Sequence, residues 1–318
     1  MCDCFGDSLE TEKTYRLEDL EKTEFGGTSI AVIGHPIQHS ISPAMHNAAL
    51  AKLSETEKRF KDWTYYRFDV PPEQLEKALP FFHKQGFRGL NLTIPHKVQA
   101  LDLIEEISPE AQSIGAVNTL VWSETGYSGL NTDGYGLEQG LKVDLEVAFE
   151  GATVMILGAG GAARAAAVQA ILSRCKRLYI GNRSPDRLKE LTDILKPILD
   201  EIQLRTFAFD ALPHDLPASG VVINATALGL KSDDPAPIDV APLPAEWRIY
   251  DMIYNPSKTP LLKQAEARGL SVANGLSMLV HQGARALEVW THAVVDADVM
   301  MAAAQEALKY SALDTDKL

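Results

Sequence analysis

The feature that most constrains the fold is a glycine-rich turn at the middle of the chain, in the stretch TVMILGAGGAARAA at residues 153–166. An apolar strand leads into a turn of the form G-x-G-x-x-[G/A], and a helix follows, which is the setting that gives this motif its meaning. Gly158 permits the tight turn, Gly160 lets the backbone approach a pyrophosphate, and the small Ala163 lets helix and strand pack closely. Free N–H groups at the helix start suit phosphate oxygens. The stretch predicts a dinucleotide site; the alternative is a turn without a ligand.

The end of the next strand indicates which dinucleotide fits. An NAD site usually carries Asp or Glu about 20 residues after the turn, to hold the ribose 2′-hydroxyl. That place reads Gly181-Asn182-Arg183-Ser184, with Arg187 nearby. Arginines attract a 2′-phosphate through charge-assisted hydrogen bonds, whereas a carboxylate would repel it. The sequence therefore favours NADP(H). Alternatively, these arginines form an ordinary solvated surface, neutralised by Asp186 or Glu190.

Strand and helix patterns alternate on both sides of the turn, which predicts an α/β protein with mostly parallel sheets. Before the turn, strands are expected at residues 28–34, 63–70 and 89–94, with helices between them and a hairpin around Gly126. From residue 152 on, the repeated pattern predicts an open, doubly wound sheet of the Rossmann type. Two apolar helical segments close the chain, at residues 278–290 and 299–313.

Bulk composition narrows the class of protein. The net charge is −13, which disfavours binding to nucleic acid or to an anionic membrane. No apolar run reaches the 18 residues of a membrane-spanning helix, and the acidic first 25 residues lack the apolar core of a secretory signal. Three cysteines are too few for a disulfide framework, so a cytoplasmic setting is expected. Cys2 and Cys4 can bind a metal, but a second pair of ligands is missing.

The first half of the chain carries separate polar candidates. Ser40 and Ser42 lie two apart and point the same way in an extended segment, so they can bind a carboxylate or a diol. The alternative is that Ser42 only caps a helix that starts at Pro43. Lys97 follows a predicted strand end, where α/β sheets bind ligands, and Asp133 follows another strand. A lysine and an aspartate in one cleft would form an acid/base pair.

The order of the motifs gives these candidates a common meaning. GHPIQHSISPAMHN, NLTIPHK, GAVNT, NTDG, GAGGAAR, NRS, NAT, DMIYNPSKTPLL and GLSMLVHQGARALEVW follow one another from about residue 28 to about residue 300. This series resembles the shikimate dehydrogenase family. The resemblance implies a substrate domain at residues 27–132 and 278–318 and an NADP domain at residues 133–277. Residues 1–26 stay outside it, and we expect a flexible tail that the enzyme can lose.

The resemblance also implies site roles. Lys97 and Asp133 match the catalytic pair. Substrate contacts are implied for Ser40, Ser42, Thr93, Asn118, Asp133, Tyr254 and Gln282. Cofactor contacts are implied for Gly158, Ala159, Gly160, Gly161, Ala162, Asn182, Arg183, Ser184, Arg187, Met252 and Gly275. Met278 shares a helix face with Gln282, and we interpret it as a core residue.

The implied activity is the reversible, NADPH-dependent reduction of 3-dehydroshikimate to shikimate, in the pathway to chorismate and the aromatic amino acids. Two alternatives stay open: a quinate/shikimate dehydrogenase that uses NAD, and a non-catalytic sensor of shikimate or NADP. Arg183 argues against NAD, and the presence of both Lys97 and Asp133 argues against a sensor. The expected partner is a small-molecule substrate, and the chain is expected to be a monomer or a homodimer.

Overall fold

The computed structural model describes residue 11 and residues 13–231 and 233–315, with side chains to residue 310. These residues form two units. One contains the chain up to Thr132 and from Gly283 onward, and the other is Asp133–Gln282. The second boundary falls between Gln282 and Gly283, inside α11 (Leu276–Thr291), and the boundary expected from the sequence, at residue 278, lies in the same helix. Cys2 and Cys4, and with them the possible metal pair, lie outside the described residues.

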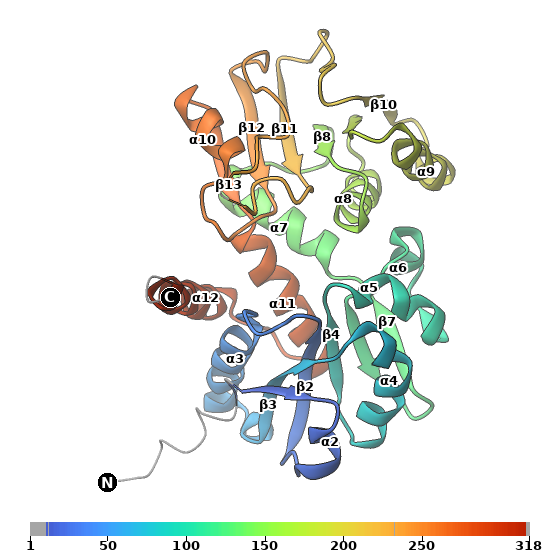
Figure 1. Ribbon diagram of the computed structural model, residues 1–318, viewed down its shortest axis with the longest axis vertical. Coiled ribbons are helices and arrows are strands. Elements are labelled where there is room, and N and C mark those ends of the chain that lie inside the picture. Colours follow the sequence, from blue (N-terminus) through green and yellow to red (C-terminus); the bar gives the residue numbers. More distant parts are fainter. Residues whose placement is uncertain (1–10, 12, 232, 316–318) are drawn as a thin grey trace. The chain divides into compact units, whose positions relative to one another are not determined.

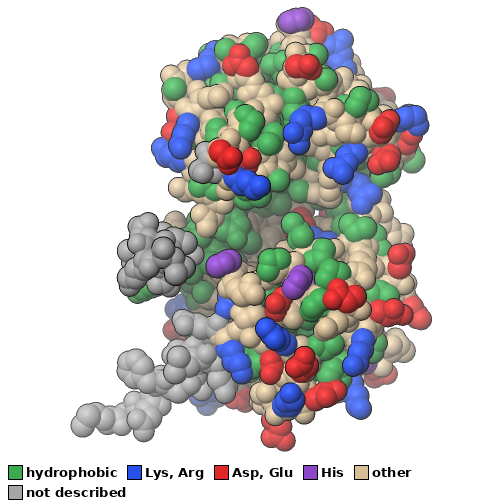
Figure 2. Space-filling model, in the orientation of Figure 1, with side chains coloured by type: hydrophobic (Ala, Val, Ile, Leu, Met, Phe, Trp, Pro, Cys, Tyr) green, Lys and Arg blue, Asp and Glu red, His purple; other side chains and the backbone are tan. Residues whose placement is uncertain are grey.

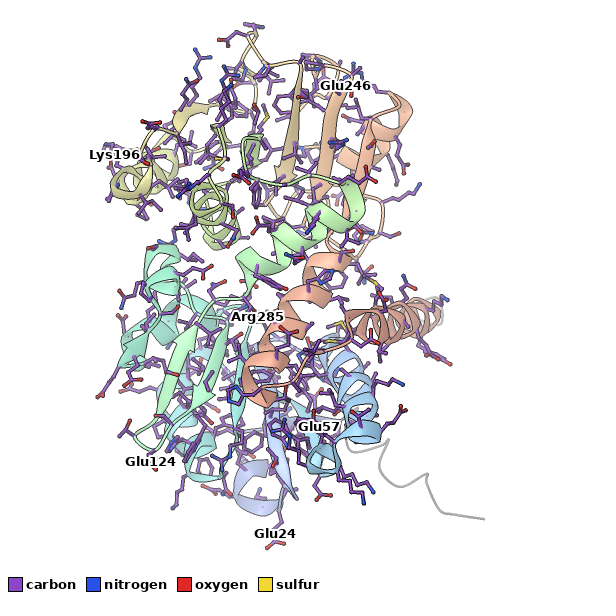
Figure 3. The ribbon with its side chains drawn as sticks, turned by 180° about the vertical axis from the view of Figure 1, so that it is seen from behind. Glu24, Glu57, Glu124, Lys196, Glu246 and Arg285 are labelled. Atoms are coloured by element: carbon purple, nitrogen blue, oxygen red, sulfur yellow. The ribbon has the colours of Figure 1, made fainter. Side chains whose placement is uncertain are left out.

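The first unit is built on a seven-stranded mixed sheet. Its strand order is β1-β3-β2-β4-β6-β7-β5, and the first four strands pair in parallel. The predicted hairpin is the antiparallel pair β6 and β7, with Glu124 in its turn (Figure 3). The bounds are β1 Thr14–Arg16, β2 Thr28–Gly34, β3 Trp63–Asp69, β4 Gly89–Leu92, β5 Glu106–Ile107, β6 Thr119–Trp122 and β7 Tyr127–Leu130.

Alternation along β3 divides its side chains between two layers. Tyr66 and Phe68 enter an aromatic cluster that includes Phe82 of α4, and Tyr65 stacks on His46 of α3. The helices α3 and α4 accordingly lie on opposite faces of the sheet, and α12 lies beside α3 (Figure 1). The helices are α2 Asp19–Lys22, α3 Ser42–Thr56, α4 Leu75–Lys84, α5 His96–Gln99, α6 Pro109–Ile114 and α12 Ala297–Thr315.

The structure corrects the prediction of a flexible tail for residues 13–26, whereas residues 1–10 and 12 of that predicted tail lie outside the described residues. β1 pairs in parallel with β3, and Tyr15, Leu17 and Leu20 are buried in the aromatic cluster. Phe25 packs edge-on against Tyr66, with ring centroids 5.0 Å apart. Arg16 and Glu18 are exposed and alternate with buried residues, as in a half-exposed edge strand. The segment is too short for this alternation to stand out in the sequence.

The second unit has a six-stranded sheet in which every pairing is parallel. Its order, β10-β9-β8-β11-β12-β13, is the third-second-first-fourth-fifth-sixth order of dinucleotide-binding folds, so the predicted Rossmann-type sheet is confirmed. The strands are β8 Thr153–Leu157, β9 Arg177–Gly181, β10 Gln203–Phe207, β11 Ser219–Asn224, β12 Glu246–Asp251 and β13 Ser271–Asn274. The helices are α7 Asp133–Leu145, α8 Gly161–Leu172, α9 Pro185–Leu195, α10 Pro260–Ala267 and the first part of α11.

Charge is spread over the surface rather than gathered by sign. On the face drawn in Figure 2, Lys and Arg side chains are interspersed with Asp and Glu side chains on both units. Several charged side chains form local ion pairs, such as Lys196 with Asp193 at 2.6 Å; Lys196, labelled in Figure 3, follows the end of α9. Within the described part of the chain, none of the helices is long and apolar enough to cross a membrane.

We predict that the N-terminal segment contributes to stability. Leu20→Ala should lower the free energy of unfolding by about 2–5 kcal/mol, because it leaves a cavity beside a fully packed cluster. Removal of all residues before Gly27 should lower it further. Denaturant unfolding of the two variants measures this, with the exposed-site change Glu18→Ala as the matched control. Unchanged stability after the truncation would restore the view of a dispensable tail.

Candidate active site

The glycine turn in the second unit leaves its backbone open. Gly158 has φ of +119°, and its N–H donates to the Gly181 carbonyl oxygen at 2.7 Å, which ties the ends of β8 and β9 together. α8 begins at Gly161. A Cβ placed on Gly160 or Gly161 would meet no heavy atom within 4 Å. The turn therefore presents unobstructed N–H groups at the first strand of the sheet, which fits a pyrophosphate.

The end of β9 carries the expected arginines. Arg183 and Arg187 are both exposed, and among the described residues neither takes part in an ion pair, so Asp186 and Glu190 do not neutralise them in this way. Ser184 caps α9 by accepting from the Arg187 N–H at 3.3 Å. The Asn182 side chain donates to the Ser184 carbonyl oxygen at 3.3 Å. This geometry shapes a cationic turn that suits a phosphate.

A buried aspartate shapes the loop after β12, and sequence reasoning did not single it out. Asp251 accepts hydrogen bonds from Asn224 at 3.0 Å, from the Thr259 hydroxyl at 2.7 Å, and from the Ile253 N–H at 3.0 Å. Burial raises the pKa of Asp251, and these three donors oppose that rise. The loop so held carries the predicted site residues Met252 and Tyr254.

Met252 lies directly against Gly275, a second predicted cofactor residue. A Cβ on Gly275 would collide with the Met252 carbonyl, and the Gly275 N–H donates to the Ile253 carbonyl oxygen at 3.2 Å. The glycine is therefore required for the end of β13 to approach this loop. Burial also raises the pKa of Tyr254.

Two glycines on α7 bring it against the first part of α11. A Cβ on Gly136 would lie 2.6 Å from the Met278 carbonyl oxygen and 2.9 Å from the Gln282 nitrogen. A Cβ on Gly140 would lie 2.5 Å from the Tyr250 hydroxyl. This close packing places Gln282 beside the first turn of α7, the helix that begins at Asp133.

In the first unit, Ser42 does not act as a helix cap. α3 begins at Ser42, and the residue before it, Ile41, makes no capping hydrogen bond. Burial raises the pKa of Tyr65 well above its ordinary value, and the neighbouring Ser42 side chain opposes the rise. A helix that starts at Pro43 with Ser42 as its cap is therefore not observed.

Tyr65 begins a buried chain of hydrogen bonds that reaches Asn118. The Tyr65 hydroxyl donates to Asn91 Oδ1 at 2.7 Å, and Asn91 Nδ2 donates to the Asn118 carbonyl oxygen at 3.2 Å. Asn118 Oδ1 accepts from the Thr132 N–H at 2.8 Å. The predicted residue Asn118 thus belongs to this network, which reaches Thr132, the residue before Asp133. Tyr65 was missed by sequence reasoning, because a tyrosine in a strand normally signals only core packing.

The carboxyl ends of β2 and β4 place two predicted segments side by side. The Thr93 N–H donates to the Ile33 carbonyl oxygen at 3.0 Å, and the His35 N–H donates to the Ile94 carbonyl oxygen at 3.1 Å. A Cβ on Gly34 would collide with the Thr93 methyl group. The segment that leads to Ser40 therefore leaves the sheet beside the segment that leads to Lys97.

Lys97 lies on the single-turn helix α5 and is half-buried. Its carbonyl oxygen accepts from the Val117 N–H at 2.8 Å, so the backbone at Lys97 is fixed next to that of Asn118. No group of three or more His, Cys, Asp or Glu residues that could hold a metal ion is found in the part of the chain that the structure describes. The side chains of Lys97, Thr93 and Asn118 offer an amine, a hydroxyl and an amide.

Comparison with known proteins shows which family the chain belongs to. Three family models match: the shikimate dehydrogenase substrate binding domain at residues 32–120, shikimate / quinate 5-dehydrogenase at residues 142–230, and the shikimate 5′-dehydrogenase C-terminal domain at residues 275–305. A shikimate dehydrogenase (NADP(+)) of Citrifermentans bemidjiense is 40% identical over 85% of this chain and 92% of its own length. This chain belongs to the shikimate dehydrogenase family.

Solved structures of the family extend the likeness to the fold. Shikimate 5-dehydrogenase from Thermus thermophilus, in complex with NADP(H) and shikimate, has a TM-score of 0.74 and 36% identity, and the match covers 88% of this chain and 99% of that one. Quinate dehydrogenase from Corynebacterium glutamicum, in complex with NAD, has a TM-score of 0.77 and 28% identity over 87% and 98% of the two chains. The fold is therefore shared by proteins named for either substrate.

We predict that His46, which lies one helical turn after Ser42 on α3, makes the free energy of unfolding depend on pH. Its Nδ1 lies 2.8 Å from the Ser42 carbonyl oxygen, and burial lowers its pKa from 6.5 to about 4. The unfolded chain then binds a proton that the folded chain does not, so stability falls as the pH drops from about 6.5 to about 4. The loss attributable to His46 is about 3 kcal/mol.

His46→Gln should flatten this part of the stability curve. Denaturant unfolding at several pH values checks it, as the difference between the curves of the unmodified chain and the variant. His83→Gln is a matched control, because the His83 side chain is only partly buried whereas His46 is 0% exposed. Parallel curves for the unmodified chain and His46→Gln would refute the assignment.

Proposed function

We propose that this chain catalyses the reversible reduction of 3-dehydroshikimate to shikimate with NADPH. Membership of the family and the names of its NADP(+) relatives support the reaction. The observation that carries the cofactor is local: an open glycine turn on β8 stands beside two exposed arginines after β9, and the place of an NAD-binding carboxylate is taken by Asn182. A 2′-phosphate fits this turn better than a bare ribose hydroxyl.

The proposed NADP(H) contacts follow from this fit. The turn would hold the pyrophosphate, the segment after β9 would hold the 2′-phosphate, and the loop after β12 would border the nicotinamide. Bound NADPH supplies the hydride. The residues are Gly158, Ala159, Gly160, Gly161, Ala162, Asn182, Arg183, Ser184, Arg187, Met252 and Gly275.

The proposed substrate contacts come from the hydrogen-bonded framework of the first unit and from three segments of the second. The hydroxyls of Ser40 and Ser42 would bind the substrate carboxylate, and the other contacts would come from Thr93, Asn118, Asp133, Tyr254 and Gln282. In this proposal residues 27–132 and 278–318 form the substrate domain, and residues 133–277 form the NADP(H) domain, in which Asp133 and Tyr254 would also contact the substrate.

Lys97 and Asp133 would manage the proton. As hydride reaches the carbonyl carbon, negative charge grows on the oxygen, and the Lys97 ammonium stabilises this charge and donates a proton to it. In the reverse direction the neutral amine accepts the hydroxyl proton. Asp133 would orient the ammonium and bind a substrate hydroxyl. Acid/base assistance of this kind typically contributes about 10²–10⁴-fold in rate.

We predict that Lys97→Ala lowers turnover by about 10²–10⁴-fold and changes shikimate binding little, because the lysine acts mainly in the transition state. Asp133→Asn should weaken both binding and turnover. The double variant should be little worse than the worse single variant, since residues that act as one unit are not additive. Shikimate-dependent reduction of NADP⁺ measures all three. Lys84→Ala, an exposed lysine on α4, is the control. Near-normal turnover of Lys97→Ala would contradict the assignment, and losses that multiply would contradict the coupling.

We predict that Arg183→Ala raises the KM for NADP⁺ by about tenfold or more and leaves the KM for NAD⁺ nearly unchanged, because the lost charge serves only the 2′-phosphate. Lys189→Ala is the control: it removes an exposed charge from α9, the helix that follows Arg183, without changing the turn itself. It should change neither the KM for NADP⁺ nor the KM for NAD⁺. Equal use of NADP⁺ and NAD⁺ by the unmodified chain, or oxidation of quinate in preference to shikimate, would favour the quinate dehydrogenase alternative. Absence of any turnover would favour a sensor.

A further inference from the structure

β1 places Thr14 beside Arg67, an arginine that contacts the segment with Ser40 and Ser42. Thr14 is the Cα partner of Arg67 in the parallel pairing of β1 with β3. Arg67 Nε donates to the Thr14 hydroxyl at 2.8 Å, and Arg67 Nη1 donates to the Ser40 carbonyl oxygen at 2.8 Å. Thr14 lies outside the family's substrate-domain match, which begins at residue 32. A residue outside this match therefore contacts Arg67, and Arg67 in turn contacts Ser40, one of the residues proposed to bind substrate.

Arg67 and Tyr65 lie on the same face of β3, next to the segment that carries Ser40 and Ser42. They lie two residues apart, so their side chains share a face of the sheet. Arg67 donates to the carbonyl oxygen of Ser40, and the Tyr65 hydroxyl on the same face donates to Asn91 Oδ1. A guanidinium is planar and always charged, so bonds at two of its nitrogens fix its orientation. The Ser42 N–H donates to the Ser40 hydroxyl oxygen at 3.4 Å, which links the two serines to each other.

We propose that Arg67, aligned by Thr14, is a positioning residue that orders the Ser40–Ser42 segment for an anionic group of the substrate. The N-terminal strand is then part of the machinery of substrate binding in this chain. The nature of the anionic group, a carboxylate, rests on the proposed function. The ordering of the segment does not, because it follows from the hydrogen bonds alone.

The first test is kinetic. Arg67→Met should raise the KM for shikimate by about tenfold, equivalent to the loss of one charged hydrogen bond, with kcat and the KM for NADP⁺ within about twofold of the unmodified chain. Thr14→Val, which keeps the shape of β1 but removes the acceptor, should raise the KM for shikimate by a smaller factor. Arg67→Lys should recover part of the Arg67→Met loss, because it keeps a donor.

Leu79→Ala controls for a general loss of stability in this unit. Leu79 is buried in the cluster on the opposite face of the sheet, so its truncation should lower the melting temperature and leave the KM for shikimate unchanged. If Arg67→Met fails to fold, Thr14→Val gives the answer. An unchanged KM for shikimate in the Arg67 and Thr14 variants, in a chain that does oxidise shikimate, overturns the proposal and leaves the proposed function intact.

The second test needs no substrate. Hydrogen exchange followed by mass spectrometry should show faster exchange of the amides at residues 35–42 in Arg67→Met and in Thr14→Val, and unchanged exchange there in Leu79→Ala at matched stability. If the unmodified chain does not oxidise shikimate, the proposed function has failed, and this measurement alone decides the ordering role. Equal exchange in all variants overturns that role.

Discussion

The parallel pairing of β2 with β3 and β4 is the constraint on which the first unit depends. Parallel pairing brings the carboxyl ends of neighbouring strands to one edge, so that the segments after Gly34 and after Leu92 leave the sheet together. Three polar side chains behind this edge, those of Tyr65, Asn91 and Asn118, are buried. Burial of unpaired polar groups would be strongly unfavourable, and each of the three is hydrogen-bonded within the network. The edge is therefore held in one arrangement by buried polar groups that form their hydrogen bonds with one another and with their neighbours.

In the second unit, glycines and a buried aspartate fix the backbone around the proposed cofactor site. Its turn needs glycine at Gly158, which has a left-handed φ, whereas Gly160 and Gly161 border open space at the start of α8. α7 uses Gly136 to approach α11. The buried Asp251 accepts from three neutral donors, those of Asn224, Ile253 and Thr259, so the loop after β12 is fixed by hydrogen bonds to uncharged groups.

Sequence reasoning found the elements whose signals are local. The glycine turn, the strand at residues 28–34 and the hairpin around Gly126 all follow from patterns of a few adjacent residues. β1 was missed because it has three residues and its partner lies about fifty positions away. α7 was missed because glycines weaken a helical pattern, although here they permit close packing. Tyr65, Asp251 and Arg67 escaped notice for a related reason: their roles depend on partners that only the fold brings near. The positions of the candidate residues could thus be predicted from motifs, but the framework that orients them could not.

The discontinuity of the first unit has a consequence for how the chain is made. This unit is completed only by the residues from Gly283 onward, where Trp290 donates to the Leu120 carbonyl oxygen at 2.9 Å and α12 packs on α3. The second unit is one continuous stretch that leaves the ribosome earlier. Domains generally fold as units during synthesis. The Rossmann-type sheet of the second unit can therefore form before the carboxyl-terminal helices are available to cover α3 and β6. The order of synthesis is therefore not the order of completion, and the half that is translated first is finished last.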